Sequence, residues 1–167
     1  MNTAQQIEND IALNADGDQY LTFMLDGEEY GVDILRVQEI KGWDSVTPIP
    51  NTPQYIKGVI NLRGTIVPIF DLRERFALEP VPYGPTTVVI VLKVKNDEGT
   101  RTMGIVVDAV SEVYNINEDE LKASPDFGAA ISTDFVQGLA TIDEKMIIVL
   151  DIDDLLNSSV ADPLDLG

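Results

Sequence analysis

Residues 51–73 read NTPQYIKGVINLRGTIVPIFDLR and contain two strand patterns joined by a short turn. The strand residues within 59–70 are apolar on both faces. The turn at 61–64 has asparagine first and glycine fourth, which suits a type I turn, and it shows Leu62 and Arg63 to solvent. No side chain in this stretch is suited to catalysis, so we expect the hairpin to offer a surface for another protein.

The composition excludes several classes of site. The 167 residues include no cysteine and no histidine, which rules out disulfides, thiolate zinc sites and histidine-dependent catalytic triads. Residues 14–18 resemble the start of a calcium-binding EF-hand loop, but the required glycine and bidentate glutamate are missing. No glycine-rich phosphate-binding motif is present. We therefore expect no metal and no cofactor.

The charge of the chain is strongly negative, and this limits its partners. The formal net charge is −18, from 29 acidic and 11 basic residues. Such a chain repels phosphate backbones and anionic lipids, so we expect no nucleic-acid binding and no direct membrane insertion. The strongly apolar runs reach only about five residues, and no secretory signal is visible at the start of the chain. The expected location is cytoplasmic.

Two pairs of segments suggest an internal repeat. The stretch 31–40 aligns with 104–113, and the stretches 58–71 and 138–151 each begin with glycine and end with aspartate. Chance similarity between β-rich segments is the alternative. A cluster of helix- and strand-breaking residues at 81–85 falls between the copies. The expected organisation is an acidic lead-in at 1–18, a first β-barrel subdomain at 19–84, a second with a short C-terminal helix at 85–157, and an acidic tail at 158–167.

Strand patterns dominate both copies, which favours two small closed barrels. Residues 88–92 and 146–150 are apolar on both faces, whereas a lone small barrel would leave one face of each strand in water. Two barrels packed around a shared core would bury both faces. Pro68 predicts an edge position for its strand. Short helices are expected after three residues with capping patterns: Asp71, Asn117 and Asp151.

Some residues allow more than one interpretation. Any two of the 29 acidic residues can in principle form the carboxylate pair of a hydrolase, although a single tryptophan argues against an aromatic-lined cleft. Glu39 and Arg63 are either solvated residues of a strand edge and a turn, or charges that pair across a protein interface. Three glycines are expected to serve the backbone, by positive φ or close packing, and not a ligand: Gly58, Gly104 and Gly138.

The most specific motif is the run NLRG-x-IVPI-x-DLR at residues 61–73. It is accompanied by YGVDILRVQEI at 30–40, by GIVVD at 104–108 and by Gly-Leu at 138–139. Together these segments resemble the CheW family of bacterial chemotaxis coupling proteins, over residues 20–156. Domains of this type also occur in the kinase CheA and the adaptor CheV, but the chain leaves no room for a kinase or receiver domain.

The resemblance implies a mainly β fold of two SH3-like five-stranded barrels around a shared hydrophobic core, with short helices. It implies no catalysis. It also implies an adaptor that couples the cytoplasmic hairpin tips of chemoreceptors to the regulatory domain of the histidine kinase CheA, and that is recruited to receptor arrays at the membrane. An adaptor of a non-chemotaxis receptor–kinase pathway is the alternative.

The resemblance also assigns contact residues, position by position. The receptor-binding positions are Val37, Glu39 and Arg63. The kinase-binding positions are Ile66, Tyr83 and Val88. A second kinase or array contact falls at Lys122 and Phe127. The family often has arginine where this chain has Lys122, so a bidentate contact is not available there.

Overall fold

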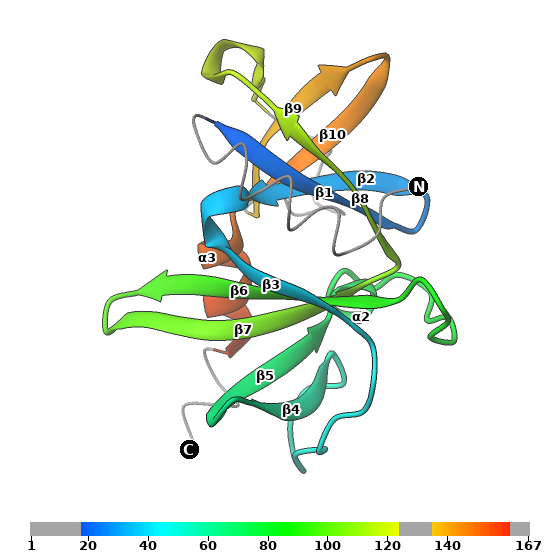
Figure 1. Ribbon diagram of the computed structural model, residues 1–167, viewed down its shortest axis with the longest axis vertical. Coiled ribbons are helices and arrows are strands. Elements are labelled where there is room, and N and C mark those ends of the chain that lie inside the picture. Colours follow the sequence, from blue (N-terminus) through cyan, green and yellow to red (C-terminus); the bar gives the residue numbers. More distant parts are fainter. Residues whose placement is uncertain (1–17, 124–134, 161–167) are drawn as a thin grey trace.

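Two five-stranded β-sheets lie one above the other in the computed structural model, which describes residues 18–123 and 135–160 (Figure 1). The first sheet has the order β8-β1-β2-β10-β9 and consists of β1 (Gln19–Leu25), β2 (Glu28–Asp33), β8 (Ala109–Asn115), β9 (Val136–Ile142) and β10 (Lys145–Leu150). The second has the order β3-β6-β7-β5-β4 and consists of β3 (Val37–Gly42), β4 (Ile56–Leu62), β5 (Thr65–Asp71), β6 (Val88–Asn96) and β7 (Gly99–Val107). The helical segments are η1 (Ile34–Arg36), α2 (Leu72–Arg75), η2 (Glu118–Glu120) and α3 (Ile152–Val160).

The sheets do not follow the predicted boundary between residues 84 and 85. The first sheet combines the β1–β2 hairpin with β8, β9 and β10, and the second combines the β6–β7 hairpin with β3, β4 and β5. Each copy of the repeat thus gives its first hairpin to the sheet of the other copy. The predicted subdomains 19–84 and 85–157 match the two sequence copies but do not correspond to the two sheets.

The strand registers reveal an internal symmetry. β2 joins β10 in parallel with Gly31 opposite Val149, and β7 joins β5 in parallel with Gly104 opposite Ile69. Isolated bridges recur in the same way, between Thr47 and Val59 in one half and between Lys122 and Leu139 in the other. The aligned glycines of the sequence repeat therefore occupy equivalent places in the two sheets.

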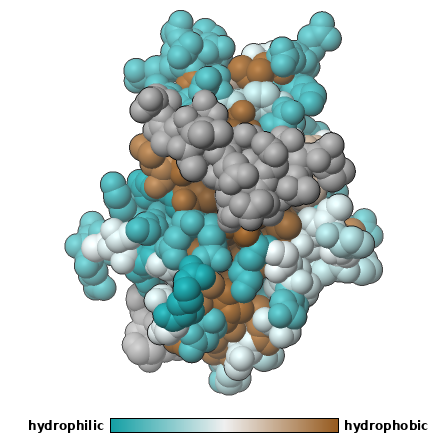
Figure 2. All heavy atoms as spheres, viewed as in Figure 1, coloured by the Kyte–Doolittle hydropathy of each residue, from teal (hydrophilic) through white to brown (hydrophobic). Residues whose placement is uncertain are grey.

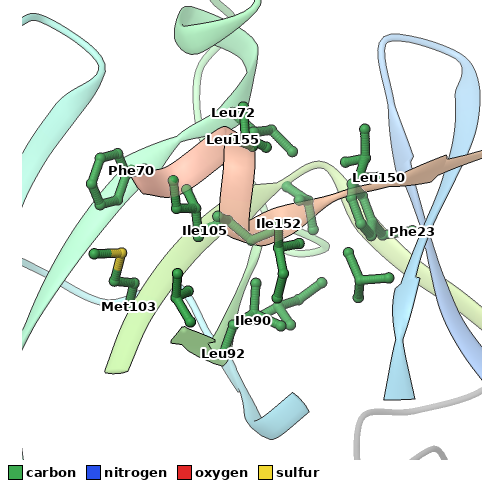
Figure 3. Close-up of a cluster of buried hydrophobic side chains, with 14 of the residues drawn as sticks. Phe23, Phe70, Leu72, Ile90, Leu92, Met103, Ile105, Leu150, Ile152 and Leu155 are labelled. Carbon is green, nitrogen blue, oxygen red and sulfur yellow. The ribbon is translucent and has the colours of Figure 1, made fainter. Parts of the chain in front are cut away.

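A shared hydrophobic core lies between the sheets, around α3 (Figure 3). Side chains of both sheets and of α3 meet there, and the residues labelled in the figure are at most 5% exposed. They are Phe23, Phe70, Leu72, Ile90, Leu92, Met103, Ile105, Leu150, Ile152 and Leu155. Apolar burial on this scale is the main force that holds two small sheets together. The predicted shared core is confirmed.

The strands that are apolar on both faces serve two clusters each. On β6, Ile90 and Leu92 face the shared core, whereas Val89 and Val91 belong to a smaller cluster of the second sheet. On β10, Leu150 faces the shared core, and the preceding residue, Val149, points to the other face and belongs to a corresponding cluster of the first sheet. Alternation of side chains along a strand thus explains why neither face carries polar residues.

Two local predictions are wrong. The β4–β5 turn is centred on Arg63 and Gly64, with φ of 51° and 91°, as in the type I′ turns of two-residue hairpins and not in a type I turn. The strand of Pro68 is not an edge strand, because β5 lies between β7 and β4. Its pairing with β7 begins only at Ile69, so the proline precedes that ladder.

The predicted helix starts are confirmed. The Asp71 carboxylate accepts a hydrogen bond from the Glu74 amide at 3.2 Å, and the Asp151 carboxylate accepts one from the Asp154 amide at 3.1 Å. The amide of Asn117 donates to Glu120 Oε1 at 3.0 Å. α3 extends to Val160, three residues past the expected end of the second subdomain. Within the described residues, none of the helices has the length and hydrophobicity needed to cross a bilayer.

Candidate protein-interaction surfaces

Glu39 and Arg63 form an ion pair where the two ends of the second sheet meet, a line of contact called the seam below. Glu39 lies on β3 and Arg63 at the β4–β5 turn, and β3 and β4 are the two outer strands of this sheet. The backbone bridge between Thr47 and Val59 spans the same seam. The Arg63 side chain is 69% exposed and that of Glu39 is 22% exposed. The pair therefore presents most of the Arg63 side chain to solvent, held by a better-buried glutamate.

A β-bulge separates Val37 from Glu39. Val37 lies opposite Leu92 and Glu39 lies opposite the next residue of β6, Val91, so Gln38 is the extra residue. Leu92 faces the shared core and Val91 faces the cluster of the second sheet. Val37 accordingly packs, partly buried, against the shared core, while Glu39 lies on the opposite face. The structure brings Glu39 to Arg63 but turns Val37 away from both.

The predicted kinase-binding residues lie in different environments. Ile66, near the start of β5, is 59% exposed. The ring of Tyr83 packs edge-on against Trp43 with centroids 4.4 Å apart, and its hydroxyl donates to the buried Asp71 carboxylate. Burial and this hydrogen bond raise the pKa of Tyr83. Val88 is partly buried against the shared core.

The strand registers place Ile66 and Val88 at opposite ends of the second sheet. β5 meets Gly104 of β7 three residues after Ile66, and Val88 meets Val107, three residues beyond Gly104. Six residues of strand span ~20 Å. Tyr83 lies toward the Val88 end, because its partner Asp71 is the last residue of β5. A partner that contacts all three residues must therefore run along the sheet.

Only half of the second predicted contact falls on described residues. Lys122 is exposed and forms an isolated bridge, donating its amide to Leu139 O at 2.8 Å and accepting from the Leu139 amide at 2.7 Å. Phe127 lies outside the described residues, as do the predicted lead-in up to residue 17 and the tail from residue 161.

The three predicted glycines lie where strands approach closely. A Cβ on Gly104 would lie 2.7 Å from Ile69 Cδ1, and one on Gly138 would lie 2.7 Å from Leu121 Cγ. Gly58 has φ of 145°, and a Cβ there would lie only 2.2 Å from a backbone oxygen of the seam. Among the described residues, no three acidic side chains are grouped so that they could hold a metal ion.

Two bidentate ion pairs were not predicted. Arg36 donates through Nη1 and Nη2 to both carboxylate oxygens of Asp153, each at 2.8 Å. Arg73 donates through Nε and Nη2 to those of Asp108, at 2.9 and 3.0 Å. The partners are 117 and 35 residues apart in the chain, so no sequence spacing links them.

The two aspartates have pKa values below their ordinary range. Burial opposes ionisation of Asp153, but hydrogen bonds from Arg36 and the Lys95 amide outweigh it and lower its pKa. Burial likewise opposes ionisation of Asp108, and hydrogen bonds from Arg73 and the Asp26 amide outweigh it and lower its pKa. Both carboxylates are thus bound as anions.

Acidification should therefore remove the contribution of these pairs. A lowered native-state pKa adds stability above the unfolded-state pKa, about 4, and that stability is lost as the pH falls through the native value. We expect Asp153→Asn to destabilise the protein at pH 7 and to have a progressively smaller effect as the pH falls below about 4 and through the lowered native-state pKa of Asp153. Urea unfolding of both proteins across this range measures the difference. An effect that is constant with pH would show that the charge of Asp153 does not contribute.

Large apolar side chains also reach the surface. In Figure 2 hydrophobic atoms are visible in the lower half of the molecule, over the second sheet, with hydrophilic ones around them. Within residues 18–123 and 135–157, three large hydrophobic residues besides Ile66 are more than 40% exposed: Leu35, Val81 and Met146. Sequence reasoning missed all three, although Met146 follows the β9–β10 turn as Ile66 follows the β4–β5 turn, so the repeat could have revealed it.

Comparison with known proteins identifies the family. The model of the CheW-like domain matches residues 19–160. The chain belongs to the CheW family. It is 50% identical to the chemotaxis protein CheW of Klebsiella aerogenes over 142 residues, which cover 85% of this chain and 83% of that protein. It is 31% identical to a probable chemotaxis protein CheW of Rhizobium etli over 148 residues, 89% of this chain and 93% of that one.

A solved CheW structure has the same architecture. The scaffolding protein TtCheW of Thermoanaerobacter tengcongensis matches with a TM-score of 0.76 and 36% identity, over 84% of this chain and 92% of that one. The two sheets are accordingly the two SH3-like barrels of the CheW fold, as predicted. CheW-family proteins are non-catalytic chemotaxis scaffolds, so the alternative of a carboxylate-dependent hydrolase is wrong.

Proposed function

We propose that this CheW-family protein couples the cytoplasmic hairpin tips of chemoreceptors to the regulatory domain of the histidine kinase CheA, in receptor arrays at the membrane. The observation that carries the proposal is the β4–β5 hairpin. Its turn presents the Glu39–Arg63 pair, and the strand that follows presents the exposed Ile66. A charged site and an apolar site for two different partners thus lie within four residues of each other, from Arg63 to Ile66.

The receptor contact would be centred on Arg63. A guanidinium group has five N–H donors, and the bond to Glu39 uses only part of them. The remaining donors face solvent and suit a carboxylate on a receptor helix. Glu39 fixes the direction of the arginine. Val37 remains proposed as a second, apolar contact with the helical hairpin, on the other face of β3, where it packs partly buried against the shared core.

The kinase contact would begin at Ile66 and extend along the second sheet to Tyr83 and Val88. Ile66 supplies exposed apolar area, which interfaces bury at their centre. Tyr83 is already fixed by Asp71 and Trp43, so little side-chain entropy would be lost when a partner covers it. Lys122 and Phe127 remain proposed as a second contact with the kinase or the array.

Charge reversal at Arg63 tests the receptor contact. We expect Arg63→Glu to weaken binding of a soluble receptor-tip fragment by at least about tenfold, because it places an anion where the receptor carboxylate binds. The double variant Glu39→Arg with Arg63→Glu restores an internal ion pair but not the charge shown to the partner, so it should remain weak. Calorimetric titration measures both affinities.

The matched control is Arg101→Glu, which makes the same charge change at an exposed cation on β7. It should leave receptor-tip affinity within about twofold of wild type, because an isolated surface charge contributes little. Equal losses of receptor-tip affinity from Arg101→Glu and Arg63→Glu would show that the loss comes from the change in net charge and not from a contact at Arg63. Full binding by the double variant would show that the pair only shapes the turn and does not contact the receptor.

A further inference from the structure

The two bidentate arginine–aspartate pairs occupy corresponding places with their charges exchanged: Arg73 aligns with Asp153 in the repeat, and Arg36 aligns with Ala109, the neighbour of Asp108. Each joins the residues just after an exchanged hairpin to the helix that follows the neighbouring parallel strand. After β1–β2 comes Arg36, which binds Asp153 of α3, next to β10. After β6–β7 comes Asp108, which binds Arg73 of α2, next to β5. Each pair therefore joins an exchanged hairpin to the other copy of the repeat: β1–β2 to the copy that contains β10 and α3, and β6–β7 to the copy that contains β5 and α2.

The Arg36 pair adjoins the start of β3, the strand that carries two of the proposed receptor-binding residues. Arg36 immediately precedes Val37, the first residue of β3. Besides Asp153, its guanidinium donates to Lys93 O at 3.2 Å. Asp153 Oδ1 also accepts from the Lys95 amide at 2.8 Å, so one carboxylate ties the start of β3 to β6 and α3. The Arg36 and Asp153 side chains are 21% and 29% exposed.

The Arg73 pair is bonded to the segments on either side of Tyr83, one of the proposed kinase-binding residues. Besides Asp108, Arg73 donates through Nη1 to Glu79 O at 2.6 Å, in the segment that leads to Tyr83. The Thr86 hydroxyl donates to Asp108 O at 2.9 Å, two residues before Val88. The Arg73 side chain is only 12% exposed. The Arg73–Asp108 pair therefore holds the chain on both sides of Tyr83, at Glu79 and at Thr86.

We infer that Asp153 and Asp108 are positioning residues for two different partners: Asp153, through Arg36, for the receptor contact at β3, and Asp108, through Arg73, for the kinase contact at Tyr83 and Val88. This inference rests on the proposed function. Neither aspartate needs to touch a partner, because each acts through an arginine and the backbone that the arginine holds. Each half of the adaptor thus has its own internal support for one partner.

The test measures both affinities for both neutral, nearly isosteric variants. We expect Asp153→Asn to weaken receptor-tip binding about three- to tenfold and to leave binding of the CheA regulatory-domain fragment unchanged. Asp108→Asn should do the reverse, by a similar factor. Asp153→Glu and Asp108→Glu, which keep the charge, should recover most of the lost affinity. Thermal unfolding of all four variants shows how far each pair also affects stability.

A purely structural role predicts a different result. Loss of stability alone would lower both affinities together, or neither, in each variant, and either pattern overturns the inference. If one asparagine variant does not fold, the asparagine variant of the other pair decides: a loss of affinity for its own partner alone supports the inference, and equal effects on both partners overturn it. Wild-type protein that binds neither fragment would refute the proposed function itself, and the inference with it.

Discussion

Gly58→Ala is expected to lower the free energy of unfolding by about 3 to 5 kcal/mol, a loss found only for strongly disruptive substitutions. Gly58 has φ of 145°, where side chains are strained, and a Cβ would lie 2.2 Å from Thr47 O and 2.7 Å from Thr47 C. The Thr47 backbone exchanges two hydrogen bonds of 2.9 Å with Val59, so it cannot move away without opening the seam. Urea unfolding measures the loss.

Gly42→Ala is the matched control for this substitution. Gly42 ends β3, and nothing lies within 4 Å of the position of its Cβ. We expect its effect on unfolding to stay within about 0.5 kcal/mol, as for ordinary surface substitutions. Because the seam also holds the Glu39–Arg63 pair, Gly58→Ala should weaken receptor-tip binding as well. A fully stable Gly58→Ala protein would contradict the close approach at the seam.

Phe23→Ala is expected to lower the free energy of unfolding by about 3 to 5 kcal/mol, the usual cost of removing a large aromatic side chain from a core. Phe23 is fully buried in the shared core and stacks on Tyr30 with centroids 5.8 Å apart. Because that core contains side chains of both sheets, the loss should shift one common transition. Tryptophan fluorescence reports the second sheet, through Trp43, and far-ultraviolet circular dichroism reports both.

The control for the core substitution is Met146→Ala. Met146 is 54% exposed, so the same kind of truncation should change stability by less than about 0.5 kcal/mol. Coincident fluorescence and dichroism transitions are expected for wild type and for Phe23→Ala. Two separate transitions would show that the sheets unfold independently and that the shared core does not couple them.

The sequence patterns predicted the parts of the fold that depend on local chemistry. Strands apolar on both faces indicated a shared core, and capping residues such as Asp71 located short helices. The exchange of hairpins could not be predicted, because the pattern of β1–β2 is equally suited to either sheet and only long-range pairing, such as Gly31 with Val149, decides between them. The turn at Arg63 was assigned the wrong type because Asn61 was taken as its first residue, whereas the turn begins one residue later, at Leu62.

The candidate surfaces were only partly visible in the sequence. The resemblance to the CheW family assigned Glu39, Arg63 and Ile66 as contact residues, but a period-two pattern cannot show the bulge that turns Val37 to the opposite face. The bond from Tyr83 to Asp71 depends on how the connection after α2 folds back, which no local signal specifies. Ion pairs between distant segments, such as Arg36 with Asp153, are invisible for the same reason.

The central claim is that one molecule of this protein joins receptor and kinase. Sedimentation of receptor-containing membranes with the CheA regulatory fragment tests it most directly. The account predicts that the kinase fragment sediments only when this protein is present. With Arg63→Glu, neither this protein nor the kinase fragment should sediment. With Ile66→Glu, this protein should still sediment with the receptor, but the kinase fragment should not. Sedimentation of the kinase fragment with the Ile66→Glu variant at the wild-type level, or without any adaptor, would contradict it.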